Sequence, residues 1–226
     1  SWSTNGDLQG MGCIYKIWIM KTDAKGNKVW QKCYGGSDVE EPTSIIQTSD
    51  GGYIIAGASK SSDGDLKVNK GGYDVWLLKI SATGVVEWSK TYGGSKDERA
   101  SCVIEAVEGG YTFGAGSGST DGDIANNIGS TDCWLVHVND TGKIIWEKSF
   151  GGTKQESILD LKQTSDSSYV FCGYTESNDI DVSKNKGKHD WWVVKTNMTG
   201  TKIWELGLGS PEGDFPNALT LAKDGY

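Results

Sequence analysis

Acidic and amide side chains recur along this chain of 226 residues in a pattern that suits cation binding. Each occurrence has two aspartates separated by one residue, followed by an asparagine and a further aspartate. Ca²⁺ prefers such hard oxygen ligands and accepts about six to eight of them in flexible loops. The alternative is turn capping, in which the same oxygens accept hydrogen bonds from loop N–H groups. The twelve positions are Asp63, Asp65, Asn69, Asp74, Asp121, Asp123, Asn127, Asp132, Asp179, Asp181, Asn185 and Asp190.

The first copy of this pattern departs from the other three. Asn5 stands for the first aspartate, Met11 for the asparagine and Lys16 for the last aspartate. An ammonium group repels a divalent cation, and Lys16 can pair with Asp7 instead. If these segments bind calcium, we therefore expect binding in the later three copies and none in the first.

A second acidic series has a constant spacing of 58 residues and comprises Glu40, Glu98, Glu156 and Asp214. Two carboxylates can act as acid and base in glycoside hydrolysis, so a glycan-active enzyme is an alternative hypothesis for function. Carboxylates that recur in every copy are better explained by the structure of the repeat. The three glutamates nevertheless remain candidate ligand-binding residues.

The other ingredients of catalysis are missing from the sequence. The two histidines, His137 and His189, occupy unrelated repeat positions, and no cysteine has a periodic neighbour that could act as its base. No nucleophile-elbow, zinc-protease or Cys-x-x-Cys motif is present. We therefore expect a protein without enzymatic activity.

Aromatic residues near these polar segments suggest a second kind of site. Trp2 and Trp191 fall outside the periodic tryptophan positions, and Tyr73 and His189 share one repeat position. Such rings could stack on a sugar, which makes these four residues candidate ligand-binding residues together with the three glutamates. The alternative is local packing at the edge of a sheet.

An internal repeat decides the fold class. Eight of the ten tryptophans fall into two series with a constant spacing of 58 residues. Glycines and tyrosines keep the same interval, for example Tyr53 and Tyr111. The tryptophan series are Trp18, Trp76, Trp134 and Trp192, and Trp30, Trp88, Trp146 and Trp204. We expect these tryptophans to pack between repeat copies.

Within one repeat the apolar residues alternate with a period of two, which indicates strands. Four short strands separated by glycine-containing turns fit into each copy. A lone four-stranded sheet buries little apolar surface, whereas identical sheets in tandem bury more when they stack around an axis. The sequence therefore predicts an all-β chain, a β-propeller built from four-stranded antiparallel blades.

The second copy carries a further resemblance. It contains Asp50-Gly51-Gly52-Tyr53-Ile54-Ile55-Ala56-Gly57, then Asp74-Val75-Trp76-Leu77-Leu78-Lys79, Gly84-Val85-Val86-Glu87-Trp88 and Gly93-Gly94. This combination resembles the surface propeller repeats of Bacteroidetes and of some secreted archaeal proteins, and is distantly similar to quinoprotein-like blades. The resemblance covers nearly the whole chain. It implies strands at 43–48, 53–59, 73–81 and 85–92, an exported or cell-surface protein, and no catalytic residues.

The repeat divides the chain into copies at about 1–42, 43–99, 100–157 and 158–226. The ends could meet to close a four-bladed ring, or the copies could be a segment of a longer propeller. Because successive strands are antiparallel, the long loops at 60–72 and 93–99 should share one face with their counterparts. We expect any binding site on this long-loop face.

Composition limits the partners. The net charge of −8 and the pI near 4.8 oppose binding to nucleic acid. No apolar run is long enough for a membrane span. The five cysteines occupy five different repeat positions, so we expect no shared disulfide framework.

Together these features predict an extracellular or cell-surface module that binds a protein or glycan through its long-loop face, with calcium as a possible ion. The alternatives are a glycan-active propeller enzyme and a structural spacer in a large adhesin.

Overall fold

The computed structural model describes residues 6–223, and these form an all-β chain with one short 3₁₀ helix, Gly6–Leu8. The strands are β1 Ile17–Thr22, β2 Lys28–Tyr34, β3 Glu40–Gln47, β4 Tyr53–Ser59, β5 Asp74–Ile80, β6 Val86–Tyr92, β7 Glu98–Glu105, β8 Tyr111–Ser117, β9 Asp132–Val138, β10 Ile144–Phe150, β11 Glu156–Gln163, β12 Tyr169–Thr175, β13 Asp190–Thr196 and β14 Lys202–Leu208. None of the described residues forms a helix that is long and apolar enough to cross a membrane.

Three antiparallel four-stranded sheets follow one another, and in each sheet every strand pairs with the next along the chain. We number them by repeat copy as blade 2 (β3–β6), blade 3 (β7–β10) and blade 4 (β11–β14). From residue 6 onward, the first copy contributes the paired strands of one hairpin, β1–β2. This arrangement confirms the predicted all-β, blade-type propeller architecture.

The strand bounds in blade 2 agree closely with the expected ones, except that β3 begins earlier, at Glu40, which pairs with Ser59. The pairing of the first two strands shifts register at one place, between Pro42 and Ser44 in blade 2. The same irregularity recurs one repeat later in blades 3 and 4. A β-bulge that recurs at one repeat position is a built-in feature of the blade.

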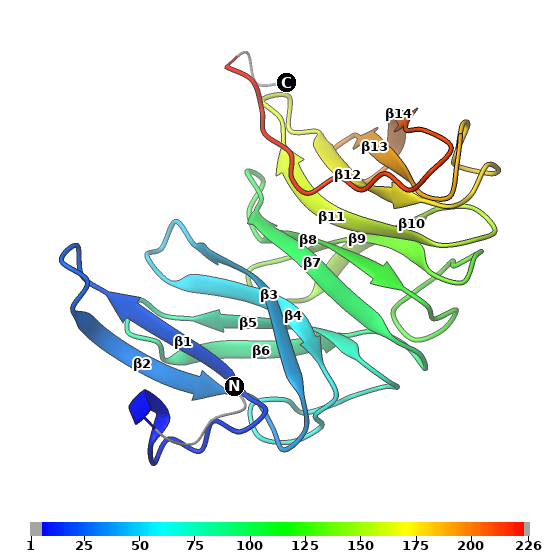
Figure 1. Ribbon diagram of the computed structural model, residues 1–226. Helices are drawn as coiled ribbons and strands as arrows, with labels where there is room; N and C mark the ends of the chain where they lie inside the picture. The colour runs from blue at the N-terminus through cyan, green and yellow to red at the C-terminus, as the bar shows by residue number, and fades with distance from the viewer. Residues whose placement is uncertain (1–5, 224–226) are drawn as a thin grey trace.

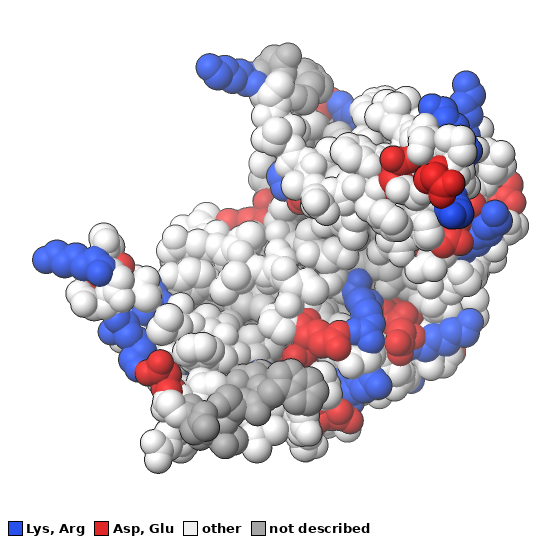
Figure 2. Space-filling model, viewed as in Figure 1, with Lys and Arg blue, Asp and Glu red and all other residues white. Residues whose placement is uncertain are grey.

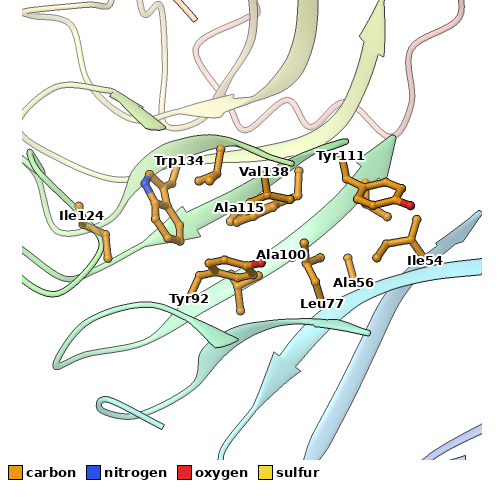
Figure 3. Close-up of a cluster of buried hydrophobic side chains, with 14 residues drawn as sticks. Ile54, Ala56, Leu77, Tyr92, Ala100, Tyr111, Ala115, Ile124, Trp134 and Val138 are labelled. Atoms are coloured by element: carbon orange, nitrogen blue, oxygen red, sulfur yellow. The ribbon is translucent and has the colours of Figure 1, made fainter. Parts of the chain in front are cut away.

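The core lies between neighbouring sheets. The largest buried cluster joins Ile54 and Leu77 of blade 2 to Phe113 and Trp134 of blade 3, and Figure 3 shows side chains of both sheets meeting in this layer. Equivalent clusters join the hairpin β1–β2 to blade 2 and blade 3 to blade 4. Stacking of the sheets therefore buries the apolar faces that each sheet alone would expose.

The periodic tryptophans follow this layering, with exceptions at the two ends. Trp76, Trp134 and Trp192 are buried, and Trp30, Trp88 and Trp146 are partly buried beside the clusters. The prediction of packing between copies is thus confirmed for these six. It is wrong for Trp18 and Trp204, which are 39% and 44% exposed because no described sheet covers them.

The sheets follow an open arc. Figure 1 shows the hairpin β1–β2 and blade 4 at opposite ends, with β3, β7 and β11 lining the hollow between them. Figure 2 shows charged side chains of both signs along the rim that carries the long loops and a largely uncharged surface above this rim. The described residues therefore do not close a four-bladed ring.

Candidate functional site

The long loops of each blade, which run from 60 to 73 in blade 2 and recur in blades 3 and 4, lie against the connection that enters the blade from the preceding copy. In blade 2 this connection is the segment Gly35 to Val39, and the N–H of Asp65 donates to the carbonyl of Gly35. The same bond joins Asp123 to Gly93 and Asp181 to Gly151. The two kinds of loop therefore share one face, as predicted.

The two aspartates of each long loop bind the N–H groups of this connection. Asp65 Oδ2 accepts from the N–H of Gly35 at 2.8 Å, and Asp63 Oδ1 accepts from that of Ser37 at 2.8 Å. In blade 3 the partners are Gly93 at 3.0 Å and Ser95 at 2.7 Å, and in blade 4 they are Gly151 at 3.4 Å and Thr153 at 3.0 Å. The bond from Ser37 lowers the pKa of Asp63, and that from Ser95 lowers the pKa of Asp121.

The asparagine and the last aspartate of the pattern close the loop on itself. Asn69 donates through Nδ2 to the carbonyl of Ser59 at 3.0 Å, and Asp74 Oδ2 accepts from the N–H of Lys70 at 2.8 Å. The same pair of bonds recurs through Asn127 and Asp132 in blade 3, and through Asn185 and Asp190 in blade 4. All twelve residues thus make turn- or loop-capping hydrogen bonds, and Asp123 and Asp181 also form ion pairs with Lys70 and Lys202.

Calcium finds no preformed cage here. Among residues 6–223, no three His, Cys, Asp or Glu side chains converge closely enough to hold a metal ion. The carboxylate oxygens of Asp63, Asp65, Asp121 and Asp123 already accept hydrogen bonds from loop N–H groups. Calcium binding by these loops remains a prediction, and capping accounts for the geometry.

The periodic glutamates are buried beneath the same connections. Glu98 accepts bonds from Ser117 Oγ and from the N–H groups of Ser119 and Gly94, at 2.8 to 3.0 Å. Glu156 repeats this arrangement, and Glu40 accepts from Ser59 and Ser61. None of the three is more than 5% exposed. A substrate could not reach these carboxylates unless the loops opened.

A pair of buried carboxylates meets around Gly93. A Cβ atom added at this glycine would lie 2.5 Å from Asp74 Oδ1 and 2.7 Å from Glu98 Oε2, so only glycine fits. Burial raises the pKa of Asp74 to about 6, and the charges of Glu98 and Asp123 add to this rise. Burial also raises the pKa of Asp132 at the equivalent place in blade 3. Two carboxylates this close disfavour double ionisation.

The first copy replaces this acid pair with a base and an acid. Lys16 stands at the repeat position of Asp74. Burial raises the pKa of Glu40, and the charge of Lys16 is among the interactions that oppose the rise. The same charge lowers the pKa of Asp63. The junction between the hairpin and blade 2 therefore has a lysine at this repeat position, whereas at the next junction the charge of Lys70 opposes the rise in the pKa of Asp74 from a neighbouring position.

The described members of the predicted aromatic set, Tyr73, His189 and Trp191, lie on two different blades. Tyr73 is only 8% exposed, and the guanidinium of Arg99 lies 3.5 Å from its ring centroid. At the same repeat position in the fourth copy, the His189 ring lies 4.8 Å from that of Phe215. The first contact joins blade 2 to β7 of blade 3, the second joins blade 4 to the segment after β14, and both are packing contacts. Trp191 is 41% exposed on β13, and Trp2 lies outside the described residues.

Two features were missed by sequence reasoning. Cys13 and Cys33 form a disulfide bond within the first copy, whereas Cys102, Cys133 and Cys172 are buried and free. The repeat copies share no set of disulfide bonds among the described residues. The single bond could not be predicted from the repeat, because its two cysteines do not recur in the other copies. Its pairing requires the fold, which brings the segment before β1 against β2.

The second missed feature is Ile180, at the tip of the long loop of blade 4. Its φ is 58°, in the left-handed region, where blades 2 and 3 have Gly64 and Gly122. A β-branched residue in this region is a conformational outlier. The sequence did contain the signal, because Ile180 interrupts the Asp-Gly-Asp pattern of the other copies.

Comparison with known proteins adds little. No family model matches the chain, and no curated protein matches it. Among solved structures, a protein of unknown function from Bacteroides caccae aligns with 12% identity and a TM-score of 0.30, over 83% of this chain and 74% of that one. Likeness at this level supports no conclusion about fold or function.

Proposed function

We propose that this chain is a non-catalytic binding and scaffold module that presents its long-loop face to a protein or glycan partner. The observation that carries the proposal is Ile180. A β-branched residue with positive φ costs about 1–3 kcal/mol of folding free energy, and such strain tends to occur at functional sites. Ile180 is 61% exposed, so core packing does not repay this cost.

The rest of the face supports the same proposal. Each long loop exposes one aliphatic side chain, Val68, Ile128 or Ile180, and each of these is more than half exposed. The capping bonds described above hold the loops in place, so these side chains form a fixed surface that loses little entropy on binding. Ordered aliphatic side chains among charges of both signs favour a protein partner over a sugar. The burial of Glu40, Glu98 and Glu156 weighs against the glycan-active alternative.

We also propose that the protein is exported or displayed at the cell surface, as the repeat resemblance implies. The disulfide between Cys13 and Cys33 supports this location, because disulfides persist in oxidising compartments and are rare in the cytosol. Membership in the surface-repeat family is part of the same proposal.

The test is to screen the chain against secreted and surface proteins and against a glycan array, and then to repeat each positive result with Ile180→Gly. We expect this variant to be about 1 kcal/mol more stable, since glycine tolerates a positive φ, and to bind its partner at least 10-fold more weakly. The matched control is Val107→Gly, which removes an exposed aliphatic side chain from a short turn on the other face. Unchanged binding by Ile180→Gly, or turnover of a glycan by the chain, would overturn the proposal.

A further inference from the structure

The second strand of a complete blade pairs with the first strand of its own sheet and makes two further contacts. It pairs with the third strand of its own sheet, and it packs against the first strand of the next blade. Thus β4 pairs with β5 and packs on β7, and β8 pairs with β9 and packs on β11. These two examples define the environment that a second strand requires.

The packing of a second strand on the next blade is seen in the burial of the first strand of that blade. Ala100 and Val103 of β7 are 1% and 2% exposed beneath blade 2, and Ile158 and Leu161 of β11 are both fully buried beneath blade 3. In β3 the same repeat positions carry Pro42 and Ile45. Both are exposed, and Ile45 is 50% exposed. Thus β3 has the surface on which a second strand packs, and no strand between Gly6 and Lys223 packs there.

The third strand of the first copy also has a free edge, where a second strand would pair. Strand β1 occupies the third-strand position of the first copy, and its only pairing among residues 6–223 is with β2. A groove of about 330 Å³ separates β1 from β3. One wall is Ile17, Trp18, Ile19 and Met20, and the other is Pro42 to Ile45 with Ile55. Figure 1 shows β1 and β3 as neighbours with no strand between them.

We propose that this groove binds, as an added β-strand, a polypeptide segment with the sequence pattern of β4, β8 and β12. The pattern is Tyr, any residue, Ile or Phe, a small residue, Gly or Ala, any residue, and Ser or Thr. An exposed strand edge supplies backbone hydrogen bonds for such an addition, and flanking side chains supply specificity. No residue that lines the groove is charged, which matches the uncharged pattern.

The complete blades also fix the register. Gly57 lies opposite Trp76, Ala115 opposite Trp134 and Gly173 opposite Trp192. The bound strand should therefore place Gly or Ala opposite Trp18. The preceding residue must be small too, because a Cβ added at Gly114 would lie 2.6 Å from Ile158 Cγ2 on the next blade. In the groove this residue faces Pro42.

The test uses the whole chain and a labelled peptide of residues 50–61, which contains β4. We expect saturable binding, measured by fluorescence anisotropy, and slower amide hydrogen exchange at residues 17–22. A peptide with Ala56→Phe should bind at least 10-fold more weakly, because the ring has no room against β3. A scrambled peptide should not bind.

The protein-side variant is Ile45→Asp, which places a charge in the uncharged groove and should weaken binding of the same peptide at least 10-fold. Ile45 is half exposed, so the fold should tolerate the change. Val107→Asp, at an exposed turn outside the groove, should bind as the parent does. The proposal is overturned if the peptide fails to bind, if Ala56→Phe binds equally well, or if exchange slows at another strand edge, such as β14, instead of β1.

Discussion

Trp18 and Trp134 occupy the same repeat position but lie in different environments. Both are on the third strand of a copy and pair across to the fourth strand, Trp18 with Cys33 and Trp134 with Ser149. Trp134 is fully buried because the sheet of blade 2 covers it, whereas Trp18 is 39% exposed because no described sheet precedes the hairpin β1–β2. Local sequence and strand pairing therefore do not determine burial in this fold. The neighbouring sheet does.

The two regions also differ in what holds them together. Strand β9 of blade 3 is paired on both edges, whereas β1 is paired on one edge and β2 carries a disulfide bond to the segment before β1. The junction of the hairpin with blade 2 places Lys16 near Glu40, whereas the next junction places Asp74 beside Glu98. Each of these differences can be tested by a separate variant or treatment.

The largest effect should come from the tryptophans. Trp134→Ala removes a fully buried ring from a packed interface, and we expect it to lower the free energy of unfolding by about 3–5 kcal/mol. Trp18→Ala should cost about 1 kcal/mol, because more than a third of the side chain already contacts solvent. Urea denaturation followed by circular dichroism measures both. Equal losses would show that the environments of the two residues differ less than their exposures indicate.

Reduction of the Cys13–Cys33 bond should act on the hairpin alone. The bond closes a loop with a sequence separation of 20, and its loss should destabilise the hairpin by about 3 kcal/mol through chain entropy. Hydrogen exchange at residues 17–34 should then accelerate while exchange in β9 stays the same. The double variant Cys13→Ala with Cys33→Ala should reproduce the effect without reductant. Accelerated exchange in blade 3 would contradict the assignment.

The acid pair at Gly93 should make stability depend on pH. The folded-state pKa of Asp74, about 6, lies above the ordinary value of 3.8, so the folded chain holds this proton more tightly than the unfolded chain. Protonated Asp74 therefore stabilises the folded chain below pH 3.8. This part of the free energy of unfolding, up to about 3 kcal/mol, is lost as the pH rises through about 6.

Urea denaturation at pH 4.5 and pH 7.5 tests this linkage. Asp74→Asn should reduce the difference in unfolding free energy between the two pH values, because the amide does not titrate. Glu212→Gln, which changes a carboxylate that is 78% exposed, is the control and should leave the difference unchanged. If Asp74→Asn leaves the difference in unfolding free energy unchanged, the pH dependence arises from another group.

The smallest expected effect is that of calcium. The aspartates of the long loops already accept loop N–H bonds, so we expect the same melting temperature in excess calcium and in chelator. Bound calcium would instead raise the melting temperature with ion concentration. If calcium raises the melting temperature of the parent chain but not of Asp121→Asn, the long loops bind calcium in addition to capping their turns.

Much of the fold could be predicted from periodicity. The alternation around Trp76 and Trp88, with the turn at Gly84, is enough to place β5 and β6 to within one residue. The candidate site was predicted less well. Asp63 lies in a long loop as predicted, whereas Glu98, expected in the loop 93–99, is the first residue of β7. The spacing of carboxylates in a sequence does not reveal which N–H groups donate to them. Tyr73 was proposed as a ligand contact and is instead covered by Arg99.

The sequence by itself determined the strands, their order within each blade and the face that carries the long loops, because these follow from alternation, turn chemistry and antiparallel pairing along one chain. Only the tertiary structure decided that the blades form an open arc, that Trp18 is exposed, that Cys13 bonds to Cys33 and that Asp74 meets Glu98. These properties depend on contacts between different copies. A periodic sequence specifies the same side chain at every copy, but within residues 6–223 no further sheet packs on either end of the arc, and there the same residue has a different environment.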